Sequence, residues 1–291
     1  MELAQMRMVK AVAETGSIAL AAQRLHCVPS NITTRIKHLE SELGTDLFVR
    51  AGRGLSISPA GEVFLEYCAQ ILNLVDEAKR AVDANTRPSG TLRIGAIESC
   101  ATVHLPALLA EYHRTYPEVT LELITGTWTQ LLEDVRQRRL DGALVAADIH
   151  HPKIASTALY SEKLVLISAA DSAPIHNAHD LLGRTLIMWP NGCPYRAALK
   201  NWVQDCDRNP PIASYGSWGT IIGSVNAGAG VSLVPEGILR RYEQSTGLAT
   251  YRFDELAPVQ NSFIWHKETT RHPAREAFAR LLRERLETRP E

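Results

Sequence analysis

The sequence contains little that would place it among secreted, membrane or disulfide-rich proteins. Its five cysteines, at positions 27, 68, 100, 193 and 206, form no CxxC pair, and an odd count argues against a disulfide framework. No run approaches the roughly 18 apolar residues of a membrane helix, and the N-terminus lacks the apolar core of a signal peptide. We therefore expect a cytoplasmic chain with no membrane partner.

Signatures of catalysis and of cofactor binding are also missing. The chain has no GxSxG, HExxH or phosphate-loop motif. No His, Cys or acidic cluster has metal-ligand spacing, and His150-His151 is an adjacent pair that faces two ways on any regular element. The sequence thus predicts no enzyme, no cofactor and no metal site.

A strong excess of charge of one sign is absent as well. Lys and Arg number 31 against 32 Asp and Glu, which gives a formal net charge of −1. Binding to a polyanion would therefore depend on a local basic surface, doubled by dimerisation, rather than on the charge of the whole chain. A length of 291 residues is long for one core and suits two or three units.

Residues 1–58 carry the most informative pattern, three helical segments followed by a short hairpin. Thr15-Gly16 ends the first helix, Ser17 can cap the second, and Pro29 suits the first position of the third. Gly44 ends the third helix. Apolar residues recur at helical spacing at Leu3, Met6, Val9 and Val12 and again at Ile32, Ile36, Leu39 and Leu43.

The face of the third helix opposite its apolar side is rich in hydroxyls and bare of acids. Such side chains near a helix start can reach base edges, and lysine can pair with phosphate. Residues 50–54 then form a glycine-rich turn with two arginines between short strands, the layout of a winged helix-turn-helix. The alternative is an ordinary solvated helix pair and hairpin with no DNA-binding role. It does not explain why the helix face lacks acids or why the turn carries two arginines. The expected DNA contacts are Ser30, Asn31, Thr33, Thr34, Lys37, Arg50 and Arg53.

Several motifs in this part are similar to the signature of LysR-type transcriptional regulators. They are Glu14-Thr15-Gly16-Ser17-Ile18, Ala21-Ala22-Gln23-Arg24-Leu25-His26, Ile36-Lys37-His38-Leu39-Glu40, Glu42-Leu43-Gly44, Leu47-Phe48-Val49-Arg50 and Ser58-Pro59-Ala60-Gly61-Glu62. The resemblance is dense over the first sixty-odd residues and weaker beyond. Where members commonly have Ser/Thr-Gln-Pro/Ser, this chain has Val28-Pro29-Ser30. Pro29 has no N–H or side-chain donor, which shifts base reading to Ser30, Asn31 and Thr34.

Residues 59–88 are expected to form a linker and dimerisation helix followed by a hinge. A heptad seam runs through Phe64, Cys68, Ile71, Val75, Ala78 and Val82. This seam predicts pairing with a second copy, which would present two recognition helices to successive major grooves. A monomeric helix lying on the next domain is the alternative. The family resemblance implies further assembly into a homotetramer and contact with RNA polymerase at the promoter.

Strand and helix patterns alternate from residue 89 to residue 291, which predicts an open, mainly parallel α/β sheet. The resemblance implies a two-lobed, periplasmic-binding-protein-like effector domain. Lobe I would comprise about 91–161 and 265–291, and lobe II about 162–264. The whole chain is thus expected to be an α/β protein with an α-rich N-terminal part.

The ends of several of these strands should meet in a cleft between the lobes, because ligands of open α/β sheets bind at the carboxyl ends of strands. The expected effector contacts are Ser99, Cys100, Thr102, Thr127, Cys193, Arg196, Trp218 and Gly219. Hydroxyls, free N–H groups and Arg196 would suit an anionic ligand, and Trp218 an aromatic one. Each residue also has a structural reading, as a helix cap, an ion-pair partner or part of the core.

Cys100 and Cys193 leave a second mechanism open. Both lie beside predicted helix N-termini, which lower the pKa of a thiol. The α/β domain would then sense oxidation, or only assemble, without a small ligand. A stand-alone solute-binding protein does not fit a chain with a winged domain. We predict a bacterial, sequence-specific DNA-binding transcriptional regulator that binds double-stranded DNA under the control of a small-molecule effector.

Overall fold

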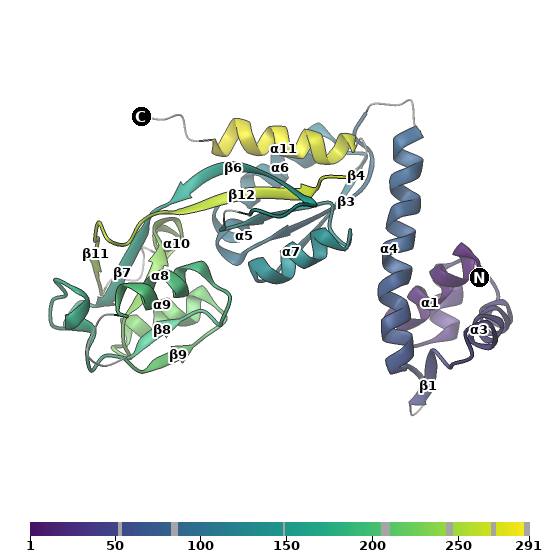
Figure 1. Cartoon of the computed structure of the whole chain (residues 1–291), viewed down its shortest axis with the longest axis horizontal. Coiled ribbons are helices and arrows are strands. Elements are labelled where there is room, and N and C mark those ends of the chain that lie inside the picture. The colour runs from purple at the N-terminus through teal and green to yellow at the C-terminus, as the bar shows by residue number, and fades with distance from the viewer. Residues whose placement is uncertain are drawn as a thin grey trace. The chain divides into compact units, whose positions relative to one another are not determined.

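The structure is a computed structural model that describes residues 1–51, 54–82, 87–147, 149–204, 210–242, 247–268 and 272–287. The chain divides into two compact units (Figure 1). One comprises Met1–Ala84 with Gln137–Arg139, and the other Asn85–Arg136 with Leu140–Glu291. Two residues named above, Arg53 and Cys206, lie outside the described ranges.

The first unit contains short helices, a hairpin and one long helix. Its elements are α1 (Leu3–Thr15), α2 (Ile18–Arg24), α3 (Pro29–Leu43), β1 (Phe48–Ala51), β2 (Gly54–Ile57) and α4 (Pro59–Val82). Gly16 and Gly44 end α1 and α3 in the left-handed conformation, with φ of 63° and 70°. Ser17 Oγ accepts the N–H of Leu20 at 3.4 Å and so caps α2. These are the helix boundaries that the sequence predicts.

The hairpin is fastened directly to the helices. β1 and β2 pair antiparallel, and the N–H of Leu55 donates to the carbonyl of Gly16 at 3.0 Å. Oε1 of Glu40 on α3 accepts the N–H of Leu47 at 2.8 Å and that of Phe48 at 3.3 Å. The strand that follows, β1, carries Arg50 and is therefore attached to α3 itself.

The long helix α4 packs against α1 through part of the predicted heptad seam and through Leu72, which lies outside the seam. Cys68 and Leu72 pack with Met6 of α1, and Phe64 and Ile71 lie against the same cluster. Half of the predicted seam is thus used inside the unit, because α1 lies along α4. The large apolar side chains that α4 leaves exposed are Val63, Tyr67, Leu74 and Val82.

The first lobe of the second unit is a sheet in the order β4-β3-β5-β12-β6. Its strands are β3 (Gly90–Ala96), β4 (Val119–Thr125), β5 (Gly142–Val145), β6 (Ile154–Glu162) and β12 (Val259–His266). Its helices are α5 (Glu98–Val103), α6 (Leu105–Thr115), α7 (Trp128–Arg136) and α11 (Pro273–Leu286). In Figure 1, α6 and α11 cover one face of this sheet and α7 covers the other.

The second lobe contains smaller sheets. Its strands are β7 (Leu164–Ala169), β8 (Leu186–Met188), β9 (Ile212–Ser214), β10 (Ser232–Pro235) and β11 (Leu248–Tyr251). Its helices are α8 (Pro194–Trp202), α9 (Trp218–Asn226), α10 (Glu236–Arg241) and a 3-10 turn at Ala178–Leu181. β7 runs antiparallel to β10 and β11, whereas β8 and β9 pair in parallel.

Two expectations about this unit are corrected by the pairing of its strands. The sheets are not mainly parallel, since β12 runs antiparallel to β5 and β6, and β7 is antiparallel to both neighbours. The return to lobe I was expected at about residue 265, but β12 pairs with β6 from Val259 onward. Residues 259–264 belong to the first lobe because Phe263 and Ile264 are fully buried in its core.

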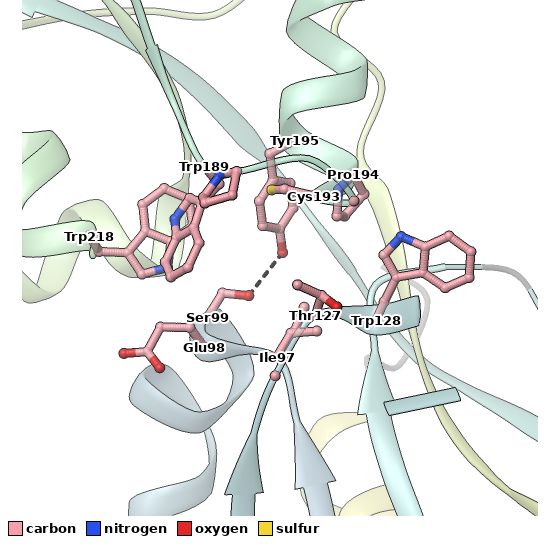
Figure 2. Close-up of a pocket in the computed structure, with 13 residues that line it drawn as sticks. Ile97, Glu98, Ser99, Thr127, Trp128, Trp189, Cys193, Pro194, Tyr195 and Trp218 are labelled. Atoms are coloured by element: carbon pink, nitrogen blue, oxygen red, sulfur yellow. Dashed lines mark hydrogen bonds between the residues drawn. The ribbon is translucent and has the colours of Figure 1, made fainter. Parts of the chain in front are cut away.

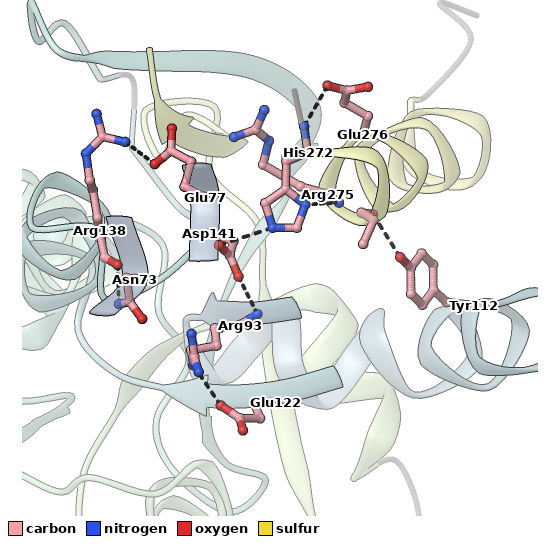
Figure 3. Close-up of polar contacts among 11 residues, drawn as sticks. Asn73, Glu77, Arg93, Tyr112, Glu122, Arg138, Asp141, His272, Arg275 and Glu276 are labelled. Atoms are coloured by element: carbon pink, nitrogen blue, oxygen red, sulfur yellow. Dashed lines mark hydrogen bonds and ion pairs between the residues drawn. The ribbon is translucent and has the colours of Figure 1, made fainter. Parts of the chain in front are cut away.

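A buried polar contact fastens the start of α11 to the first sheet (Figure 3). Nδ1 of His272 accepts the N–H of Arg275 at 3.1 Å, and Nε2 lies 3.2 Å from Oδ1 of Asp141. The other oxygen of Asp141 accepts the N–H of Arg93 at 2.8 Å, and Tyr112 donates to the carbonyl of Ala274 at 2.8 Å. Because His272 is 1% exposed, this group of contacts is structural.

Candidate functional sites

The third helix, α3, presents a short polar surface to solvent. Its apolar residues Ile32, Ile36 and Leu39 are buried in the unit, while the side chains between them are exposed or half-buried. The structure brings three predicted contacts, Ser30, Thr34 and Lys37, to that exposed face, and Arg50 is exposed on β1. Hydroxyls and cations arranged in this way can contact base edges and phosphates.

Two other predicted contacts are occupied within α3. Oδ1 of Asn31 accepts Nε of Arg35 at 3.1 Å, and Arg35 also pairs with Glu2 at 2.6 Å. The hydroxyl of Thr33 donates to the carbonyl of Pro29 at 3.1 Å. Their side chains are therefore less available to DNA than those of Thr34 and Lys37.

Sequence reasoning did not select Val28 as a contact. Its side chain is 62% exposed at the cap of α3, next to exposed Pro29. An exposed branched apolar side chain at the start of a recognition helix can pack against the methyl group of thymine. The available signal was its position outside the apolar repeat of α3.

A small cavity lies in the second unit where strand ends and helix starts of the two lobes meet. Its volume is about 110 Å³. The residues that line it are Ile97, Glu98, Ser99, Gly126, Thr127, Trp128, Trp189, Pro190, Gly192, Cys193, Pro194, Tyr195 and Trp218. They come from the segments after β3, β4 and β8 and from the starts of α5, α7, α8 and α9.

Aromatic rings dominate the walls of this cavity (Figure 2). The rings of Trp189 and Trp218 meet edge to face with centroids 5.2 Å apart, and those of Tyr195 and Trp218 are 6.0 Å apart. Ser99 and Tyr195 bridge the two lobes through a hydrogen bond of 3.0 Å between their hydroxyls. Figure 2 shows Trp128 on the opposite side of this bond from the Trp189–Trp218 pair.

Four of the eight predicted effector contacts line the cavity, and four do not. The lining ones are Ser99, Thr127, Cys193 and Trp218. Arg196 turns away because it donates to the carbonyl of Trp189 and to Oγ of Ser214, both at 2.8 Å. Thr102 donates to Glu98 along α5 at 3.3 Å. Gly219 follows Trp218 on α9 but is not part of the lining.

Cys100 is the fourth residue outside the lining. It is fully buried on α5, where its sulfur lies 3.2 Å from the hydroxyl of Tyr160 and 3.3 Å from Oδ1 of Asn261. Burial raises the pKa of the Cys100 thiol to about 12. Burial also raises the pKa of Cys193, although the backbone N–H groups of Arg196 and Tyr195 partly oppose it. The lowering expected from helix N-termini is thus outweighed by desolvation at both sites.

The cavity contains functional candidates that sequence reasoning did not select: Glu98, Trp128, Trp189 and Tyr195. Each follows a strand or starts a helix in the segments that were expected to converge. The sequence signal that could have identified them was the clustering of aromatic residues at those strand ends.

In the described ranges, no helix is long and apolar enough to cross a membrane. No group of three His, Cys, Asp or Glu residues there could hold a metal ion.

Comparison with known proteins agrees with this architecture. A family model described as "Bacterial regulatory helix-turn-helix protein, lysR family" matches residues 3–62, and one described as "LysR substrate binding domain" matches residues 85–287. The uncharacterized HTH-type transcriptional regulator YusT of Bacillus subtilis is 37% identical, over 92% of this chain and 91% of its own. The HTH-type transcriptional regulator GltR of the same organism is 35% identical, over 94% of each chain.

Solved structures show the same fold over the full length. A full-length OxyR variant from Pseudomonas aeruginosa has a TM-score of 0.76 at 21% identity, covering 100% of this chain and 99% of its own. Full-length CbnR complexed with its target DNA has a TM-score of 0.71 at 25% identity, covering 98% and 99%. The family models span most of the sequence, and the chain belongs to the LysR family of DNA-binding transcriptional regulators.

Proposed function

We propose that this regulator reads its operator through the exposed face of α3 and the adjoining strand β1. The observation that carries this proposal is the placement of Ser30, Thr34 and Lys37 on one solvent-facing side of α3, with Arg50 on the strand fastened to it. Lys37 and Arg50 supply phosphate contacts, and Thr34 and Ser30 contact bases. Asn31 and Thr33 form hydrogen bonds within α3 instead of contacting DNA. Val28 adds an apolar contact with a base at the start of the helix.

Assembly is proposed to run through α4. Its exposed apolar side chains include Val63, Tyr67 and Leu74, which would bury little surface in a monomer. Pairing of two copies there presents two recognition helices to one operator. Contacts between regulatory domains then produce the homotetramer, which acts with RNA polymerase at a promoter in the bacterial cytoplasm.

Control of this assembly is assigned to a small molecule in the aromatic cavity. Walls from both lobes line the cavity, and the Ser99–Tyr195 bond joins them. A ligand there has different contacts in different lobe arrangements, and it shifts the assembly by its differential affinity for those arrangements. Its binding should therefore change the footprint on the operator.

Binding of the full chain to duplexes selected from a random pool tests the DNA surface. Lys37→Ala and Arg50→Ala should each weaken binding to all sequences and flatten the salt dependence, by about one unit of slope per lost phosphate contact. Lys200→Ala, which removes an exposed lysine from α8, is the matched control and should change neither quantity. Unchanged salt slopes for both Lys37→Ala and Arg50→Ala would contradict the assignment.

A further inference from the structure

The charge around the aromatic cavity favours a cation, whereas the sequence led us to expect an anionic or aromatic ligand. Among the described residues that line it, none is Lys, Arg or His, and one, Glu98, is acidic. The nearest predicted cation, Arg196, is bonded to Trp189 and Ser214 instead. An anion in the cavity would face the carboxylate of Glu98, and no cation among the described lining residues would offset that repulsion.

The helix N-termini around the cavity also offer little to an anion. Thr127 Oγ accepts the N–H of Gln130 at 3.3 Å, and Ser217 Oγ accepts that of Thr220 at 3.5 Å, so α7 and α9 are capped by their own chain. At the start of α8, Pro194 stands at the first helical position and has no N–H to give. In α5, the carboxylate of Glu98 already occupies the first turn.

Glu98 is half-buried and forms no ion pair with any residue in the described ranges. Its carboxylate accepts a hydrogen bond of 3.3 Å from the hydroxyl of Thr102 on the same helix. In Figure 2 its carboxylate lies below Trp218, on the same side of Ser99 as the paired indoles. A carboxylate in this setting favours a cation at the cavity over a neutral or negative molecule of equal size.

The aromatic walls favour the same charge. The faces of Trp, Tyr and Phe attract ammonium groups, most strongly for Trp and when the cation is desolvated. Three tryptophans and one tyrosine line a cavity of about 110 Å³. Since an apolar cavity of about 150 Å³ accommodates benzene, this space fits an ion of a few non-hydrogen atoms.

We propose that the effector of this regulator is a small organic ammonium ion, held between the aromatic rings of the cavity and the carboxylate of Glu98. This assignment rests on the proposed effector control, of which it names the ligand class. Trp128, Trp189 and Trp218 provide the ring faces, and Glu98 provides the charge. An alkylated ammonium group suits the site because its methyl groups bury apolar surface while its charge remains.

Isothermal titration of the full chain with three compact molecules of similar size, each built around a quaternary centre, tests the charge preference. They are tetramethylammonium, neutral neopentyl alcohol and anionic pivalate, each at matched ionic strength. Tetramethylammonium should bind at least about tenfold more tightly than the other two. Equal binding of all three, preference for pivalate, or no saturable binding of tetramethylammonium would overturn the proposal.

Matched variants locate the effect. Glu98→Gln should weaken tetramethylammonium binding about tenfold, while Glu118→Gln, which removes an exposed carboxylate away from the cavity, should not. Trp128 is half-buried, so Trp128→Leu should keep the fold, as checked by circular dichroism, and still weaken binding of the cation. Full affinity in both Glu98→Gln and Trp128→Leu would place the ion elsewhere and overturn the proposal.

A footprint on selected operator DNA separates this assignment from the proposed effector control. If tetramethylammonium binds the cavity as expected but leaves the footprint unchanged, the ligand class stands and cavity-based control fails. If pivalate or neopentyl alcohol binds there and alters the footprint instead, control stands and the ammonium assignment fails.

Discussion

The polar face of α3 and the aromatic cavity place their functional side chains in opposite directions. On α3, Ser30, Thr34 and Lys37 come from eight consecutive positions and point to solvent. The cavity is assembled from segments as distant as Ile97 and Trp218, whose side chains point inward. The first arrangement follows from one helix, whereas the second exists only when both lobes have folded.

This difference has an energetic side. Exposed residues on α3 have few packing contacts, and substitutions at such positions usually change stability by less than about 0.5 kcal/mol. The cavity walls are also part of the core: Ser99, Tyr195 and Trp218 are each less than 5% exposed. Changes on the outward surfaces can therefore separate function from folding, and changes in the cavity need conservative replacements.

The largest effect should come from the outward apolar surface of α4. Tyr67→Glu combined with Leu74→Glu would bury unpaired charges in a paired helix, at a cost of several kcal/mol. We expect the double variant to sediment as a smaller species and to bind operator DNA about a hundredfold more weakly, because both recognition helices no longer act together. Circular dichroism should still show a folded chain, since both residues are exposed within the single chain.

Leu20→Glu is the matched control for assembly, because Leu20 on α2 and Leu74 on α4 are both 52% exposed. It should leave the sedimentation coefficient unchanged. If the double variant on α4 still assembled fully while charges at the half-buried Ile71 and Val75 prevented assembly, the heptad seam predicted from sequence would be the interface after all.

A smaller effect is expected within α3, and it tests whether exposure decides which hydroxyl reads DNA. Thr34→Ala should change the preference among operator variants by about 1–3 kcal/mol at the base pair it contacts. Thr33→Ala removes a hydroxyl that is bonded to the carbonyl of Pro29, and should leave that preference unchanged. Competition binding with single-base operator variants measures both. If Thr34→Ala and Thr33→Ala changed operator preference equally, the exposure of a hydroxyl on α3 would not determine whether it contacts DNA.

The same contrast explains what could be predicted from the sequence. The helices α1 and α3 end at Gly16 and Gly44 because glycine tolerates the positive φ of a helix C-terminus. The buried side of α3 follows from the spacing of its apolar residues, which matches the 3.6-residue period of a helix. The choice of α4 face does not, because Cys68 and Leu72 find Met6 only after α1 folds alongside. The repeat alone cannot distinguish a partner in the same chain from one in another.

The cavity shows the limit more clearly. Strand ends could be located, and Ser99, Thr127, Cys193 and Trp218 do lie in the lining. Arg196 starts in the same segment but is drawn to the carbonyl of Trp189, and Thr102 is one turn past the cavity on α5. Side-chain direction at a helix start depends on hydrogen bonds to other segments, so charge in the cavity could not be predicted from composition.

The smallest effect is expected at the thiols of Cys100 and Cys193, where we expect no response to alkylation or oxidation. Because burial raises the pKa of Cys100 to about 12, its thiolate fraction at pH 8 is on the order of 10⁻⁴. The raised value favours the protonated folded state, so this contribution to stability is fully present below pH 9 and is lost as the pH rises toward 12. Iodoacetamide at pH 8, followed by mass spectrometry, should therefore modify half-buried Cys27 well before Cys100.

Hydrogen peroxide should likewise leave operator binding unchanged, in the unmodified chain and in Cys100→Ser and Cys193→Ser alike. The reason is that oxidation begins at the thiolate, and desolvation raises the pKa of both thiols. A loss of DNA binding on peroxide treatment that either serine variant prevented would contradict this prediction. It would also show that an oxidant reaches these thiols without a bound ligand, and the contrast between the outward surface of α3 and the inward-facing side chains of the second unit would no longer hold.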